Sequence, residues 1–296
     1  MSGRLALARG VLWVGRHAGS AHLRPYDLDG RALGPGFSFR DAQAGGSSVD
    51  GLAVDADRGL WVADGRAARV RRFTVFGGVI RTLEGSPVPS RDGRGVLGEL
   101  ADLALLQDPE GEAAPRLLVA CGGWRRHALQ LFDEDGLWLG SLRSEGDPRE
   151  RFRGVRAVDA RGRWIAVAEG GRGRVQVFRD GEFHFLVRPA AGPEGLADVG
   201  AVAVLEEGRL VVGLGGGESR SALVLLDAAG RPRQVLAGGG SGHGQVLDPC
   251  GLAVEPGVED RLARLAVLDR DGERVQVFNL EGRCYGELTE LPGARA

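Results

Sequence analysis

Acidic side chains stand just before several short aliphatic segments, where they could converge on a cation. Asp50, Asp102, Asp198 and Asp248 hold this position. Carboxylates from several segments can bind calcium or another hard cation, which needs many oxygen ligands. Aspartate is also a common turn former, and we favour that role here. We therefore expect no cofactor, and keep a bound cation such as calcium as the weaker alternative.

A second set of side chains could recognise a protein partner. Tryptophan and arginine are the residues found most often as interface anchors. The sequence places four candidates in one run: Trp124, Arg125, Arg126 and His127. Further candidates are Arg16, His17, Arg66 and Arg172. In the alternative interpretation Trp124 only covers the edge of its own structural unit.

Three acids each precede an arginine by five residues. The pairs are Asp64 with Arg69, Glu169 with Arg174, and Asp269 with Arg274. Because the spacing recurs, we expect ion pairs that staple loops rather than groups that bind a ligand. Ion pairs exposed to solvent would contribute little stability.

These side chains are carried by a repeat about fifty residues long. An alanine beside aliphatic residues marks each copy: Ala6, Ala53, Ala104, Ala157, Ala203 and Ala253, separated by 47, 51, 53, 46 and 50 residues. Such a period, filled with short apolar segments and glycine turns, is typical of a β-propeller. The sequence therefore predicts an all-β fold of six blades, each a four-stranded antiparallel sheet whose alanine strand lies nearest the axis.

The repeat resembles the NHL family. The second copy reads GLAVD at 51–55, LWVAD at 60–64 and RVRRF at 69–73, and the sixth reads GLAVE at 251–255 and RVQVF at 274–278. The resemblance implies a six-bladed propeller of the kind often used as a protein-binding scaffold. It also implies alternatives, because similar propellers include metal-dependent lyases and lactone hydrolases, and some animal NHL proteins bind RNA.

We expect one domain over residues 1–296, with blades at approximately 3–40, 46–86, 96–143, 150–188, 195–237 and 245–290. Each terminal blade has its own four strands, so we expect the first and last blades to meet through side-chain packing alone. Binding should collect on the loops between second and third strands and at the mouth of the central channel.

The candidates to line that channel are Arg156, Asp50, Asp102 and Asp248. Arg156 replaces the aliphatic residue that precedes the alanine in other copies. A buried charge must be paired or reach water. We expect Arg156 to pair with an inner-strand carboxylate, Asp102 or Asp198, although an anion site is the alternative.

Composition limits the function classes. All 38 basic residues are arginines, which is typical of a bacterial-like, GC-rich genome, and the net charge of −2 argues against general binding of nucleic acid. Three cysteines without a CxxC pair suit a reducing compartment, and no apolar segment approaches the roughly twenty residues of a membrane span. We expect a cytoplasmic protein that is a monomer or part of a hetero-complex.

The sequence favours binding over catalysis. Its five histidines occupy unrelated repeat positions, and its one asparagine, Asn279, lies near an outer turn. A metal site needs ligands that converge. We therefore predict a non-catalytic scaffold that binds a protein through its loops. A lyase or lactone hydrolase with a channel metal is the alternative, and RNA binding on an arginine-rich face is a lesser one.

Overall fold

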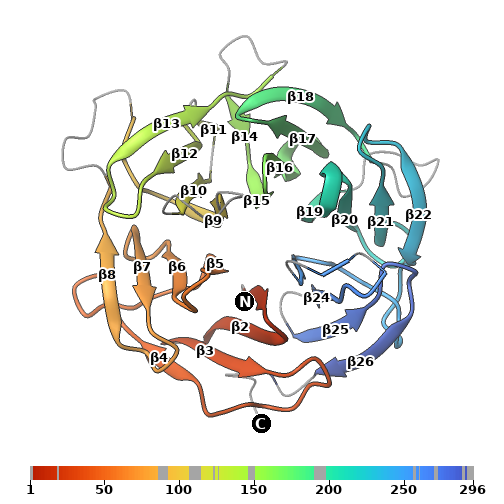
Figure 1. Ribbon diagram of the computed structural model, residues 1–296, viewed down its shortest axis with the longest axis horizontal. Helices are drawn as coiled ribbons and strands as arrows, with labels where there is room; N and C mark the ends of the chain where they lie inside the picture. Colours follow the sequence, from red (N-terminus) through yellow and green to blue (C-terminus); the bar gives the residue numbers. More distant parts are fainter. Residues whose placement is uncertain are drawn as a thin grey trace.

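The computed structural model describes residues 3–18, 20–85, 93–106, 115–122, 124–125, 127–145, 151–189, 198–255, 258–259, 261–269, 273–288 and 291. Six four-stranded antiparallel sheets stand around a common centre like the blades of a propeller, with the first strand of each blade innermost (Figure 1). The predicted fold class is confirmed. Among the described residues, no helix has the length and apolar character needed to cross a bilayer.

The strands follow the chain from the axis outward in every blade. Blade one contains β1 (Gly3–Ala8), β2 (Val11–Ala18), β3 (Ser20–Tyr26) and β4 (Phe37–Phe39). Blade two contains β5 (Gly51–Val54), β6 (Leu60–Asp64), β7 (Arg69–Phe73) and β8 (Val79–Leu83). Blade three contains β9 (Leu100–Leu106), β10 (Arg116–Cys121), β12 (Leu129–Phe132) and β13 (Trp138–Leu142).

The second half of the ring repeats this plan. Blade four contains β15 (Val155–Arg161), β16 (Trp164–Glu169), β17 (Arg174–Arg179) and β18 (Glu182–Val187). Blade five contains β19 (Asp198–Val204), β20 (Leu210–Gly215), β21 (Ala222–Leu226) and β22 (Pro232–Ala237). Blade six contains β23 (Gly251–Val254), β24 (Leu265–Asp269), β25 (Arg274–Phe278) and β26 (Cys284–Leu288).

The core lies between blades. Strands β6, β20 and β24 are buried along their whole length because each is covered on both faces by neighbouring blades. One cluster packs Trp61 and Val70 of blade two against Leu103 and Val119 of blade three. Burial on both faces explains why these second strands are continuously apolar rather than alternating.

The ring closes between two contiguous blades, as predicted. Strands β1 to β4 form one sheet and β23 to β26 form another, with no strand exchanged among the residues that the structure describes. Leu5 and Val14 of blade one pack in one buried cluster with Val277 and Leu288 of blade six. Leu291 follows β26 and is buried in the same cluster. We call this junction the seam.

One register prediction is wrong. In blade two Ala53 pairs with Trp61, three residues before the acid Asp64. In blade four the residue three before the acid Glu169 is Ala166, and it pairs with Asp159 rather than Ala157. A β-bulge between Val155 and Ala157 absorbs the difference. The axial position that holds alanine in blade two therefore holds an aspartate in blade four.

Candidate functional site

A cavity of about 200 Å³ lies at the centre of the ring and is lined by the innermost strands of all six blades. Most of its wall is aliphatic. The charged side chains in the wall are Arg4, Asp102, Asp159 and Arg161. We call this cavity the channel.

Arg4 spans three blades at the start of β1. Its Nε donates to the carbonyl oxygen of Asp50 at 2.6 Å, and its Nη2 donates to the carbonyl oxygen of Ala101 at 2.6 Å. The same Nε lies 3.7 Å from Oδ1 of Asp102. One guanidinium therefore ties the inner strand of blade one to blades two and three, and places a positive charge inside the channel.

Asp102 ties blade three to blade four. Its Oδ1 accepts from the amide of Leu103 at 2.9 Å, and its Oδ2 accepts from the amide of Val158 on β15 at 3.0 Å. Burial raises the pKa of Asp102 to about 6, although the charge of Arg4 opposes the increase. Desolvation thus outweighs a cation and two amide donors.

Asp159 makes the same link one blade further on. Its Oδ2 accepts from the amide of Val204 on β19 at 2.7 Å. Burial raises the pKa of Asp159 to about 7; the Val204 and Ala160 amides oppose this increase, and the negative charge of Asp102 adds to it. Sequence reasoning missed Asp159 because Ala157 was aligned in its place.

The other predicted channel residues have different roles. Asp50 accepts from the amide of Gly65 at 2.8 Å and from the hydroxyl of Ser48, which is the turn-forming role. The Asp248 amide donates to Oδ1 of Asp269 at 2.7 Å, so this residue belongs to the segment that leads into β23. Within the described residues, no three histidine, cysteine or acidic side chains group as a metal site would require.

Arg156 is not buried. It occupies the bulge in β15, where its side chain is 60 % exposed, and its Nη2 lies 3.6 Å from Oδ2 of Asp198. The expected pair with Asp198 is therefore confirmed, whereas the expected burial of this charge is wrong. The bulge explains the error, because it turns the extra residue away from the neighbouring blade and toward solvent.

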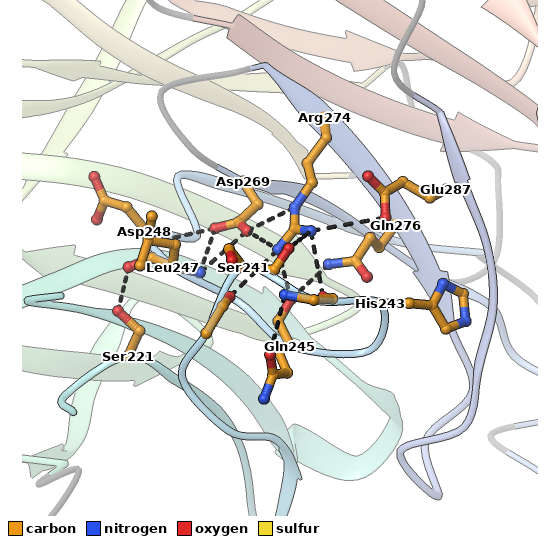
Figure 2. Close-up of polar contacts among 12 residues, drawn as sticks. Ser221, Ser241, His243, Gln245, Leu247, Asp248, Asp269, Arg274, Gln276 and Glu287 are labelled. Atoms are coloured by element: carbon orange, nitrogen blue, oxygen red, sulfur yellow. Dashed lines mark hydrogen bonds and ion pairs between the residues drawn. The ribbon is translucent and has the colours of Figure 1, made fainter. Parts of the chain in front are cut away.

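One dense polar network holds a linker, meaning the segment that joins the outer strand of one blade to the inner strand of the next. Figure 2 shows this network in blade six. Arg274 is 3 % exposed and donates to Oδ2 of Asp269 at 2.8 Å. It also donates to the carbonyl oxygens of Ser241 and Gln245, both at 2.8 Å. We call such a network a linker clamp.

Asp269 and Gln276 complete the clamp of blade six. Asp269 accepts from the amide of Leu247 at 3.0 Å. Gln276, which is fully buried, accepts from the amide of Gly244 at 2.8 Å and donates to the carbonyl oxygen of Gln245 at 2.7 Å. A side-chain amide can both donate and accept. Gln276 therefore supplies the hydrogen-bond partners that a neighbouring strand would otherwise give to the linker backbone.

Blade four repeats the clamp. Arg174 pairs with Glu169, as predicted, and also donates to the hydroxyl of Ser144 at 2.9 Å. Gln176 accepts from the amide of Glu145 at 2.9 Å. Both ion pairs are buried, so the expectation of exposed pairs worth little is wrong for blades four and six.

Blade two departs from the predicted pairing. Arg69 does not meet Asp64; it donates to Asp41 at 2.7 Å and lies 3.1 Å from Glu84. Arg71 takes the inner role instead, with Nη1 3.4 Å from Oδ2 of Asp64. Arg71 points inward because it occupies the position that glutamine holds in blades four and six.

The glutamines of the third strands were missed from the sequence. In blade three, Gln130 accepts from the amide of Gly95 at 2.6 Å and donates to the carbonyl oxygen of Val96 at 2.8 Å. The signal was present, since Gln130, Gln176 and Gln276 occupy the same place in their repeats. These positions alternate with outward ones, and a buried polar residue among aliphatic neighbours needs a partner.

The structure places the predicted partner-binding residues in different environments. Trp124 and Arg125 form the short strand β11 (Trp124–Arg125), which pairs with β14 (Phe152–Arg153) before blade four. Arg126 lies outside the described residues. His127 is half-buried, with Nδ1 3.1 Å from the hydroxyl of Ser141.

The remaining candidates differ in exposure. Arg66 is exposed in the β6–β7 loop, and Arg172 lies in a short 3-10 turn, η1 (Gly170–Arg172). The structure places Arg16 and His17 within β2 rather than in the loop that follows it. Arg16 is only 3 % exposed, which removes it from the surface.

Comparisons with known proteins support the fold. No protein-family model and no curated protein sequence matches this chain. The chain is similar to a chain in the crystal structure of a nidogen/laminin complex, with 15 % identity, a TM-score of 0.63, and coverage of 94 % of this chain and 92 % of that one. It is also similar to the WD40 β-propeller domain of Doa1, with 13 % identity, a TM-score of 0.58, and coverage of 98 % and 82 %.

A third similar structure is a protein of unknown function from Bacteroides caccae, with 15 % identity, a TM-score of 0.52, and coverage of 78 % of this chain and 80 % of that one. At these identities the likeness supports the six-bladed propeller fold alone.

Proposed function

We propose that this protein is a non-catalytic NHL-type propeller that binds another protein through its loop face. The loop face is the side that carries the second-to-third-strand loops and the linkers. The supporting observation is a contrast between one arginine in the channel and two arginines on the loop face. The channel cation Arg4 is bound to blade backbone, whereas Arg66 and Arg156 are exposed on the loop face.

Rigidity also supports this proposal. The described linkers into blades two, three, four and six are each held by buried polar side chains. A surface that is ordered before binding loses less conformational entropy when a partner docks. The three cysteines are free, which fits the proposed cytoplasmic location.

The test compares charge reversal on the two faces. The full chain carries Arg66→Glu with Arg156→Glu, and the control carries Arg231→Glu, whose side chain is 75 % exposed in the β21–β22 turn on the opposite face. A partner is identified by cross-linking in the host cell, and its affinity for each purified variant is measured by calorimetry. We expect a loss of tenfold or more for the loop-face variant and none for the control.

Equal affinity of both variants would refute binding through the loop face. One observation favours the enzyme alternative, namely the two channel carboxylates with raised pKa, because such groups suit acid–base chemistry. The guanidinium of Arg4 beside Asp102 opposes a metal at that place. Elemental analysis of the purified chain tests this directly, since a stoichiometric metal would favour the lyase or lactonase alternative.

A further inference from the structure

One aspartate interrupts a ring of alanines around the channel. In blades one to four and blade six, pairing with the second strand places one inner-strand residue at the same level of the axis. In blade four this residue is Asp159, and in the others it is an alanine that lines the channel: Ala6, Ala53, Ala104 and Ala253. The small alanine side chains leave this level of the channel open, and the carboxyl group of Asp159 borders the open space.

The arginines that line the channel each have an acid of their own. Arg4 donates to two backbone carbonyl oxygens and lies 3.7 Å from Asp102. Arg161 follows Asp159 by two residues on β15, but its Nη2 lies 3.4 Å from Oε1 of Glu206. The charges of Arg4 and Asp102 therefore balance, as do those of Arg161 and Glu206.

Asp159 has amide donors but no cation in contact. Its Oδ2 accepts from the Val204 amide at 2.7 Å, and the Ala160 amide also donates to its carboxyl group. Within the described part of the chain this carboxyl group forms no ion pair, and Arg161 acts on it only from a distance. The amides and the distant guanidinium favour the ionised form while burial opposes it, and with a pKa of about 7 the group is ionised at pH 8. One negative charge in the channel is then left without a cation in contact.

The rest of the wall favours an apolar ligand of small size. Aliphatic side chains from four inner strands line the cavity: Leu7, Leu52, Leu105 and Leu252. An apolar cavity of about 150 Å³ holds benzene. The channel, at about 200 Å³, therefore has room for an apolar body of about six or seven carbon atoms.

We propose that the channel binds a small primary alkylammonium ion, whose ammonium group pairs with Asp159 and whose alkyl chain lies along the aliphatic wall. A carboxylate has about four lone-pair sites, so Asp159 can accept from the ligand as well as from its amide donors. Opposite charges attract more strongly in a partly enclosed cavity than in water. An anionic ligand would be repelled by Asp159 and would compete with Asp102 or Glu206 for an arginine, so the site selects by charge.

The test measures binding of hexylammonium chloride to the full wild-type chain at pH 8 by calorimetry, with 1-hexanol and sodium hexanoate as ligands of matched length. Alkylamines, like lysine, keep their proton at this pH. We expect hexylammonium to bind about tenfold or more tightly than 1-hexanol, because a hydrogen bond to a charged group is the stronger one, and we expect no binding of hexanoate.

Two variants locate the charge that is responsible. Asp159→Asn should weaken hexylammonium binding about tenfold or more and leave 1-hexanol binding unchanged. The control Asp135→Asn removes the same charge from a turn where the side chain is 74 % exposed, and it should bind both ligands as the wild type does.

Absence of hexylammonium binding to the wild type, equal affinity for 1-hexanol, tighter binding of hexanoate, or undiminished binding by Asp159→Asn would each overturn the proposal. If Asp159→Asn does not fold, methyl NMR of the wild-type chain decides. Nuclear Overhauser contacts from the hexyl chain to the methyl groups of Leu105 and Val204 support the channel site, and contacts only elsewhere overturn it. None of these outcomes bears on the loop-face proposal, because Arg66 and Arg156 do not line the channel.

Discussion

Removal of the Arg274 guanidinium should be among the most destabilising single changes in this ring. The substitution Arg274→Met keeps the aliphatic length and deletes the charge. Asp269 is then left fully buried without its cation. Breaking a buried pair from one side costs about 3–5 kcal/mol. The carbonyl oxygen of Ser241 loses the Arg274 donor as well, which adds about 1 kcal/mol. We expect the free energy of unfolding to fall by about 4–6 kcal/mol.

The assay is urea unfolding followed by tryptophan fluorescence and far-UV circular dichroism. Arg231→Met is the matched control, because Arg231 pairs with Asp227 at 3.1 Å but is 75 % exposed. It should cost less than about 0.5 kcal/mol. Arg274→Lys keeps the charge and loses the planar fork, so its cost should lie between the two. If Arg274→Met unfolds within about 1 kcal/mol of the wild type, the clamp does not stabilise the ring by the mechanism of a buried pair.

Three further predictions concern the clamps, the seam and the half-buried His22. Gln176→Leu should lower the free energy of unfolding by about 2–3 kcal/mol, because the Glu145 amide loses its acceptor. The control Gln234→Leu, at an exposed position, should be nearly neutral, and equal urea midpoints for the two variants would contradict this. Leu291→Ala should cost about 2–4 kcal/mol at the seam, compared with little for Leu262→Ala at 56 % exposure, and thermal unfolding measures both. Burial lowers the pKa of His22, so its contribution to stability is present above about pH 6.5 and lost as pH falls. His22→Gln should flatten the acid side of the thermal stability profile, and a profile parallel to the wild type would be inconsistent with a lowered pKa of this half-buried imidazole.

The sequence predicts the ring because blades share one geometry. Each second strand is covered on both sides, so the same apolar segment recurs at the same place in the repeat. Contiguous terminal blades follow from the same count of strands. The sequence repeat therefore predicts the number of blades and the order of their strands.

Register within an inner strand is harder to predict. A shift of two residues keeps every side chain on the same face of a strand, so the aliphatic pattern cannot separate Ala157 from Asp159 as the axial residue. Only the pairing with β16 and the bulge after Val155 decide it. Asp159 could not be identified as the axial residue from the sequence, because it lies two residues from Ala157 and side chains two residues apart share one face of a strand.

Partner choice among charged residues also depends on geometry. Blade two offers Arg69, Arg71 and Arg72 to Asp64, and five-residue spacing selects the first. The structure instead places Arg71 beside Asp64. Arg72 lies on the other face of β7 and pairs with Asp55, while Asp41 accepts from both Arg69 and Arg71. The five-residue spacing within blade two does not reveal Asp41, because Asp41 lies in the linker that precedes the blade.

The seam gives this molecule one junction unlike the others. Elsewhere a peptide linker joins adjacent blades, whereas at the seam β1 and β2 pack against blade six through the apolar cluster described above, and the charge of Glu273 lies near Arg16. A proteolytic cut within the Gly240–Gln245 segment would sever the linker between blades five and six and release the backbone acceptors that Arg274 holds. The continuity of this linker is therefore part of what keeps blade six in the ring.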